Sequence, residues 1–400
     1  MKRVKRLISL LLVLTLILPV FAFAEPGENT SLSTEKVFER VAEKFRPELE
    51  ADKVKLETDL EQIYKDDDEV RIIVELESKP SIVYATERNI SYENMSKSLL
   101  SNIEQRIEAE QAEVKKHILS RNVDMKFLNS FKTAFNGFSG VVKFEDIKVI
   151  ESLPQVKKVY IANEYERPDI KPNMETSNDM IGALPTWDLG YKGEGTVVAI
   201  IDTGIDPSHR DMVLSEGTVP KLTRQSLQGK NLLGRYYTPK IPYGFNYYDM
   251  NHNIVDMGPD PSMHGMHVAG IAGANGDPEN GGIKGVAPEA QLLAMKVFSN
   301  DPFYATTFSD IYLVAIDEAV RLGADVINMS LGAPASFYHE DSAENRAITN
   351  ATDNGIVCSV SAGNSGSMTY GWSATNYGYP WQENPDIGVV GSPGLNKDTI

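Results

Sequence analysis

Three short motifs carry side chains that could do chemistry, and each lies beside a regular element of structure. Asp202 ends the apolar run 196–201, which is typical of a buried parallel strand. His264 opens the small-residue segment 264–273, which is typical of a closely packed helix, and Asn364 follows a strand-like apolar segment. Because the carboxyl ends of parallel strands open onto one crevice, these side chains could orient an imidazole, transfer a proton and stabilise an oxyanion.

Each motif taken alone also permits other functions. Asp202 could serve phosphoryl transfer or a structural turn, and Asp206 is expected to cap that turn. His264 and His267 lie one helical turn apart and could bind zinc, but the acid of a His-Glu-x-x-His motif and a third ligand are missing. We therefore expect His267 to be a hydrogen-bonded packing residue. No glycine–lysine loop suits a phosphate, and Cys358 is expected to be an inert core residue.

Strands and helices alternate over residues 181–400. Strand patterns recur at 291–298, 325–329 and 355–360, and a helical pattern over 309–322 stops at a glycine, which suits a helix C-cap. This alternation predicts an α/β fold in which a mostly parallel sheet has helices on both faces.

A smaller unit is predicted upstream, over residues 69–166. Its expected elements are a strand at 71–76, a helix over 91–121, strand and turn character at 135–142, a short helix around 146–152 and a strand at 156–161. The order strand, helix, strand, strand, helix, strand is typical of a small ferredoxin-like α+β unit.

The N-terminal residues 1–24 are typical of a secretory signal peptide. A basic start precedes the apolar run 7–20, and the small residues Ala22 and Ala24 suit a cut after Ala24. The run is shorter than the ~20 residues of a membrane-spanning helix, so an uncleaved anchor is the weaker alternative and no membrane span is expected after signal cleavage. Residues 25–68 are charged and are expected to form a linker or an extra pro-segment.

The segment between the two predicted units, residues 167–180, is a candidate processing linker. Pro168 and Pro172 stand among mixed charges there, which favours an extended and accessible chain. We predict that the mature N-terminus lies between Glu166 and Met180.

Composition narrows the classes of function. The chain has 400 residues, of which 42% are hydrophobic and 24% charged, as in ordinary globular proteins. Asp and Glu number 56 against 39 Lys and Arg, and this net charge of −17 argues against general nucleic-acid binding because phosphates would be repelled. The single cysteine excludes an intramolecular disulfide.

Taken together, segments 202–204, 264–270 and 361–364 resemble the subtilisin-like serine proteases, or subtilases, over residues 187–400. The resemblance implies that Asp202 orients the imidazole and that His264 acts as general base and then acid. It implies that Asn364 donates to the oxyanion. The partners implied are a protein or peptide substrate and the chain's own propeptide.

The resemblance also implies a substrate-binding surface. The family's substrate-pairing strand corresponds in this sequence to Ser330, Leu331 and Gly332. The wall of its first specificity pocket corresponds to Ser361, Ala362 and Gly363. The upstream unit resembles the subtilase propeptide, a folding assistant and inhibitor whose C-terminal end lies in the substrate cleft. Segments 243–249, 288–298 and 384–394 resemble the cell-envelope, lactocepin-like branch, whose members are large surface proteases.

A structural calcium ion is a further expectation from the resemblance, and no other cofactor is expected. Asp211 aligns with a carboxylate that binds calcium in many subtilases, and the loop 275–282 occupies the place of the ligand loop. Asp277 and Asn280 are the candidate ligands in that loop, because calcium prefers oxygen ligands. The same residues also suit a bare surface loop.

One departure from the family concerns the nucleophile. The family's serine lies in a Gly-Thr-Ser-Met-Ala-x-Pro segment, which does not occur in these 400 residues. Ser367 follows Asn364 by three residues and lacks the Thr before it and the Ala and Pro after it. The sequence therefore predicts the front part of a secreted serine endopeptidase that is inactive as given and that is wall-associated if a further C-terminal region carries an anchor. The alternative is a non-catalytic secreted remnant that acts as a binding or folding-assistant protein.

Overall fold

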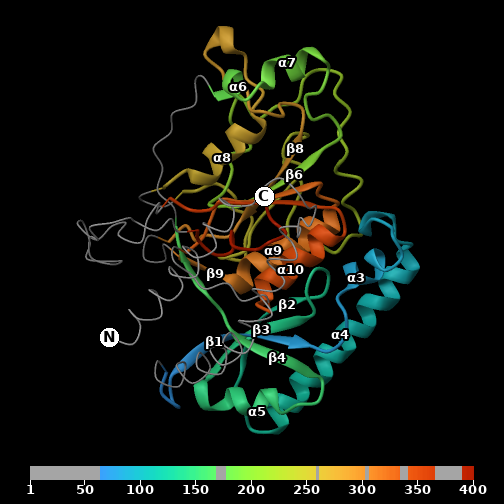
Figure 1. Ribbon diagram of the computed structural model, residues 1–400, viewed down its shortest axis with the longest axis vertical. Helices are drawn as coiled ribbons and strands as arrows, with labels where there is room; N and C mark the ends of the chain where they lie inside the picture. The colour runs from blue at the N-terminus through green and yellow to red at the C-terminus, as the bar shows by residue number, and fades with distance from the viewer. Residues whose placement is uncertain (1–63, 168–176, 258–260, 302–305, 334–340, 365–389) are drawn as a thin grey trace, which may run out of the picture. The chain divides into compact units, whose positions relative to one another are not determined.

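The computed structural model describes residues 64–167, 177–257, 261–301, 306–333, 341–364 and 390–400. The predicted signal peptide, most of the charged segment that follows it, and Ser367 lie outside the described residues. So does the greater part of the predicted processing linker. The described residues are built around two large sheets, one of four strands and one of five (Figure 1).

The first sheet has four antiparallel strands in the order β2-β3-β1-β4. With a helix between β1 and β2 and another between β3 and β4, this is the ferredoxin-like arrangement that the sequence predicted. We call residues 69–161 the four-stranded unit. Its elements are β1 (Glu69–Leu76), α3 (Ser81–Thr86), η2 (Tyr92–Asn94), α4 (Lys97–Ser120), β2 (Lys126–Phe131), β3 (Gly137–Lys143), η3 (Phe144–Asp146), α5 (Ile147–Glu151) and β4 (Val156–Ile161).

The long helix of this unit begins later than residue 91, where the sequence pattern placed its start. The Ser96 side chain accepts a hydrogen bond from the Leu99 amide at 3.4 Å and caps the first turn of α4. The apolar stripe of this helix is buried as its periodicity indicated, at Ile103, Ile107, Val114 and Ile118. Strand β2 had no clear pattern because only one of its six residues is buried.

The second sheet has five strands, all parallel, in the order β11-β10-β6-β8-β7. We call it, with its helices, the five-stranded unit. Its strands are β6 (Val197–Asp202), β7 (Tyr243–Asn246), β8 (Gln291–Lys296), β10 (Val326–Met329) and β11 (Val357–Val360). Its helices are α6 (Ser177–Met180), α7 (Ala183–Asp188), α8 (His264–Gly273), η4 (Pro278–Asn280), α9 (Ser309–Leu322) and α10 (Ala343–Asp353).

Alternate residues of the central strand β6 face opposite layers of helices. Ala199 and Ile201 belong to the buried cluster that includes the apolar residues of α9 and α10. Val198 and Ile200 belong to a second cluster, which contains Ala269 of α8. The predicted α/β fold, with a parallel sheet covered on both faces, is confirmed. Among the described residues, no helix is both long and apolar enough to cross a membrane.

Helices α9 and α10 lie between the two sheets (Figure 1). The chain leaves β4 and forms the short strand β5 (Glu164–Glu166), which pairs antiparallel with β9 (Thr306–Phe308), directly before α9. We call residues 162–167 the tail of the four-stranded unit. The sequence pattern predicted neither β5 nor β9, because three-residue strands leave no readable alternation.

Candidate active site

Asp202 and His264 meet at the carboxyl end of the parallel sheet. The His264 Nδ1 lies 2.8 Å from Asp202 Oδ1 and 2.9 Å from Oδ2. Asp202 is buried, whereas 15% of the His264 side chain is exposed. An Nδ1–H that donates to the carboxylate leaves Nε2 as a proton acceptor, and among the described residues Nε2 has no hydrogen-bond partner. The pair is therefore arranged as an oriented general base.

The turn after β6 brings the carboxylate to the helix. The Thr203 amide donates to Asp202 Oδ1 at 2.6 Å, and the Gly265 amide donates to Thr203 Oγ1 at 2.9 Å. A Cβ on Gly265 would lie 2.6 Å from the Gly204 carbonyl oxygen, which is too close for any larger residue. Glycine at position 265 thus permits the close approach of α8 to the turn that carries Asp202.

Asp256 fixes the chain just before His264. Its Oδ2 accepts hydrogen bonds from the Met263 amide at 3.0 Å and from the Ser262 hydroxyl at 3.3 Å. Met263 adopts a left-handed conformation with φ 55°, which is uncommon for a residue with a side chain. Asp256 is itself buried. Its role could not be predicted from the sequence, because no motif marks a carboxylate eight positions before a histidine.

Burial raises the pKa of Asp202, while the hydrogen bonds from His264 and Thr203 act in the opposite direction. His267 lies on the next turn of α8, where burial and the neighbouring His264 lower its pKa. No side-chain hydrogen bond of His267 to another described residue is present, so its predicted hydrogen-bonded role stays a prediction.

The segments predicted to bind substrate lie side by side at the ends of β10 and β11. The Ser361 amide donates to the Met329 carbonyl at 3.0 Å, and the Ser361 hydroxyl donates to the Leu331 carbonyl at 3.4 Å. These contacts join the stretch that begins at Ser330 to the one that ends at Asn364. Because β6, β10 and β11 are parallel, both stretches lie at the same edge of the sheet as Asp202. Among the described residues, no hydrogen bond joins Asn364 to the dyad, and its role as oxyanion donor stays a prediction.

The predicted calcium residues lie close to one another around one loop. Asp211 Oδ2 accepts from the Ile283 amide at 3.1 Å, and Asp277 accepts from the Glu279 amide and from the Asn280 side chain. Both carboxylates thus already have protein donors. In the described part of the chain, no three His, Cys, Asp or Glu side chains form a group suited to a metal ion. Calcium at this loop stays a prediction.

The tail of the four-stranded unit lies along β9 and leads toward the dyad. Tyr165 is buried, its ring packs edge-on against Tyr312 with centroids 5.6 Å apart, and the two hydroxyls are 3.2 Å apart. Two residues later, Arg167 Nη1 lies 3.9 Å from Oδ1 of Asp256, the residue that holds the chain before His264. The tail and β9 thus form a two-stranded sheet of their own, and Arg167 brings the end of the tail to the residue that holds the chain before His264.

The four-stranded unit itself binds acidic side chains of α9. Asp317 is buried and accepts hydrogen bonds from three consecutive backbone amides, those of Lys132, Thr133 and Ala134, at 2.7 to 2.9 Å. Burial raises the pKa of Asp317 to about 6, although the amides oppose this shift. The contact gives α9 a charged anchor for the unit that precedes it in the chain.

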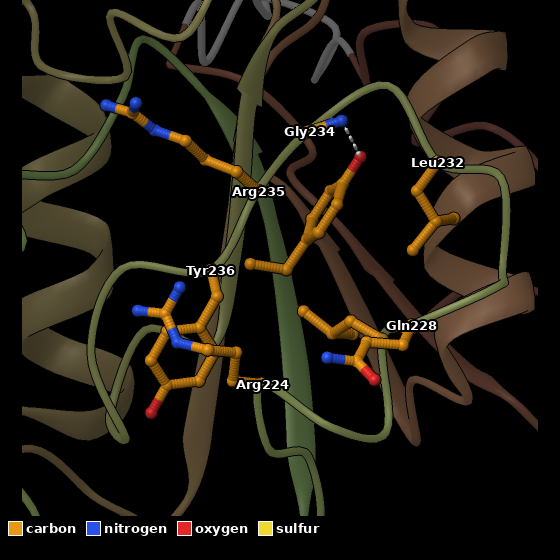
Figure 2. Close-up of a pocket in the computed structure, with 8 residues that line it drawn as sticks. Arg224, Gln228, Leu232, Gly234, Arg235 and Tyr236 are labelled. Carbon is orange, nitrogen blue, oxygen red and sulfur yellow. Dashed lines mark hydrogen bonds between the residues drawn. The ribbon is translucent and has the colours of Figure 1, made fainter.

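A shallow cavity elsewhere in the five-stranded unit is separate from this site (Figure 2). It is lined by Arg224, Leu227, Gln228, Leu232, Gly234, Arg235, Tyr236 and Tyr243. The Tyr243 hydroxyl accepts a hydrogen bond from the Gly234 amide at 2.6 Å and is also bonded to the Glu318 carboxylate. None of the predicted catalytic or substrate-binding residues lines this cavity.

Comparison with known proteins identifies the family of this chain. Residues 193–400, just over half of the chain, match the subtilase family, peptidase S8, and residues 73–167 match the peptidase inhibitor I9 family. The PII-type proteinase of Lacticaseibacillus paracasei is 39% identical over 349 residues, which are 84% of this chain and 18% of that protein. The minor extracellular protease Vpr of Bacillus subtilis is 32% identical over 342 residues, 82% of this chain and 35% of Vpr.

A solved structure also resembles the chain. The epidermin leader peptide processing serine protease EpiP of Staphylococcus aureus aligns with a TM-score of 0.47 and 16% identity, over 83% of this chain and 68% of that structure. The chain spans about a fifth of the length of the PII-type proteinase. The family match extends over the whole segment that carries Asp202, His264 and Asn364. The chain therefore belongs to the subtilase family, and within it a peptidase inhibitor I9 domain precedes the subtilase region.

Proposed function

We propose that the protein containing this chain is a secreted serine endopeptidase that hydrolyses peptide bonds. The single observation that carries the proposal is the hydrogen bond between a buried Asp202 and the Nδ1 of a partly exposed His264. Asp202 holds the imidazole in the tautomer whose Nε2 can take a proton from a serine hydroxyl. The serine oxygen attacks the peptide carbonyl, and His264 gives the proton to the leaving amine as the C–N bond breaks. A water molecule that gives a proton to His264 then hydrolyses the acyl-enzyme, and His264 returns that proton to the serine.

The remaining groups act on the substrate. In this proposal Asn364 donates to the oxygen that becomes charged in the tetrahedral intermediate. Residues 330–332 pair with the substrate backbone, and residues 361–363 form the wall of the pocket beside the cleaved bond. The family's motif that carries the nucleophilic serine does not occur in these 400 residues. We therefore expect the 400-residue chain alone to be inactive.

We also propose that the four-stranded unit is the propeptide and that its tail occupies the path of the substrate. Support comes from the pairing of β5 with β9 and from the approach of Arg167 to Asp256, next to the dyad. A chain held in this way would exclude a substrate until the linker after residue 167 is cut. Residues 1–24 would direct the protein out of the cell.

Kinetics on the product of the complete reading frame that contains these residues tests the function. Wild type is expected to hydrolyse an unfolded protein substrate, and Asp202→Asn should lower kcat by about 10⁴ while the fold is kept, because the imidazole tautomer is lost. Wild type that is folded, processed and inactive would contradict the proposal and favour a binding or folding-assistant role.

A further inference from the structure

Lys296 ends β8 directly beside Asp202, and its side chain is fully buried. The parallel register of β6 and β8 sets Asp202 opposite Lys296. The Lys296 Nζ donates a hydrogen bond to the carbonyl of Thr203, the residue that follows the aspartate. Burial of an ammonium is costly unless neighbouring groups compensate. A charged lysine beside the dyad therefore has a desolvation cost that an apolar residue at the same position would avoid.

The lysine also shapes the turn that carries the carboxylate. A Cβ on Gly204 would lie 3.2 Å from Lys296 Cδ, so the aliphatic stem packs against this glycine, whose φ is +128°. On its other side the turn is held by the Gly265 amide, which donates to Thr203 Oγ1. The turn is thus fixed between Lys296 and the first residues of α8.

The charge of Lys296 lies within a cluster of acidic groups from several elements. Asp202 of β6, Asp249 after β7 and Asp256 before α8 each stabilise its charged form, whereas Arg167 of the tail opposes it. Burial outweighs these carboxylates and lowers the pKa of Lys296 to about 8. The amine is therefore mostly protonated at neutral pH, and its charge in turn lowers the pKa of Asp202.

We propose that Lys296 is a positioning residue, which keeps the Asp202 carboxylate ionised and directed at His264 Nδ1. It does so through its charge and through its hydrogen bond to the Thr203 carbonyl. The inference rests on the proposed function, since it concerns the same dyad. Its test measures the hydrogen bond between Asp202 and His264 rather than turnover. A failure of the role proposed for Lys296 can therefore be told apart from a failure of the proposed protease function.

The experiment is proton NMR of the 400-residue chain, which follows the downfield resonance of the Nδ1–H bound to Asp202. Lys296→Met removes the charge and the donor but keeps an apolar stem, and Lys296→Arg restores both. Lys240→Met is the matched control. Lys240 is also buried, donates to the carbonyls of Pro288 and Ala290 at 2.7 and 2.5 Å, and has a pKa lowered by burial to about 7. These hydrogen bonds reach neither the dyad nor its turn.

Lys296→Met should abolish the resonance, or raise the pH at which acid abolishes it by about one unit, because the carboxylate then takes up a proton more readily. Lys296→Arg should restore the wild-type behaviour, and Lys240→Met should not change it. A folded Lys296→Met protein with the wild-type resonance and acid limit would overturn the proposal. An equal effect of Lys240→Met would also overturn it, since any buried lysine would then suffice.

A second measurement needs no variant and covers the case in which Lys296→Met does not fold. The resonance of wild type is followed as the pH is raised through about 8, together with the side-chain amine signal of Lys296. The two should change with the same midpoint, because loss of the ammonium charge alters the field on Asp202. A resonance that stays constant while the amine titrates would overturn the proposal.

Discussion

Arg71 of β1 places its guanidinium on the buried carboxylate of Asp310 in α9, with Nη2 2.9 Å from Oδ2 and Nε 2.8 Å from Oδ1. Asn129 and Ser139, from β2 and β3, donate to the same carboxylate at 2.9 and 2.6 Å. The ring of Phe308 lies under the guanidinium, 4.4 Å from its carbon. Three strands of the propeptide-like unit thus converge on one acidic residue of the subtilase region.

Arg71→Ala should therefore destabilise the chain. Removal of one partner leaves a buried charge uncompensated, and because about a quarter of the Arg71 side chain is exposed we expect a loss of about 2 to 3 kcal/mol in the free energy of unfolding. Denaturant unfolding measures it. Lys79→Ala is the control, since the pair of Lys79 with Glu87 is exposed to solvent and should contribute little to stability. If the two variants lost the same free energy of unfolding, the contact of Arg71 with Asp310 would contribute no more than an exposed ion pair.

The pH dependence of stability should carry a contribution from Asp317. Its pKa is about 6 in the folded chain and about 4 when exposed, so folding takes up a proton between these values. The folded state is therefore favoured as the pH falls, and this contribution is lost as the pH rises through about 6. Between pH 7 and pH 5, wild type should gain about 1 kcal/mol relative to Asp317→Asn. Parallel pH profiles of the two proteins would contradict this assignment.

Processing should release a mature N-terminus between Glu166 and Met180. The tail is held up to Arg167, and the two prolines that follow favour an extended, accessible segment. N-terminal sequencing of the secreted protein from the complete reading frame measures the cut. A terminus inside α4 would refute the propeptide assignment, because the buried stripe of that helix is part of the core of the four-stranded unit.

Asn364→Ala in the same protein should lower kcat by about 10²–10³ and leave KM nearly unchanged. The side-chain amide would donate to an oxygen that is charged only in the transition state, so substrate binding does not depend on it. Steady-state kinetics on one peptide substrate separates the two constants. If the change were instead confined to KM, Asn364 would belong to substrate binding.

The sequence predicted those parts of the site that rest on motifs at strand and helix ends. Asp202 ends an apolar run and His264 opens a run of small residues, and both positions are readable without a structure. Lys296 was read only as part of a strand, because the register that sets it beside Asp202 depends on pairing between residues 94 positions apart (296 − 202 = 94). Asp256 was missed because no sequence motif marks it, and β9 because a strand of three residues leaves no readable alternation.

The central claim is that His264 is the general base of a serine protease. The most direct measurement is covalent labelling of the protein from the complete reading frame with a fluorophosphonate probe, which reacts with activated serines. One label per molecule is expected in wild type and none in His264→Ala, while His267→Ala should keep labelling at a temperature where it is folded. Wild-type labelling in folded His264→Ala would contradict the account.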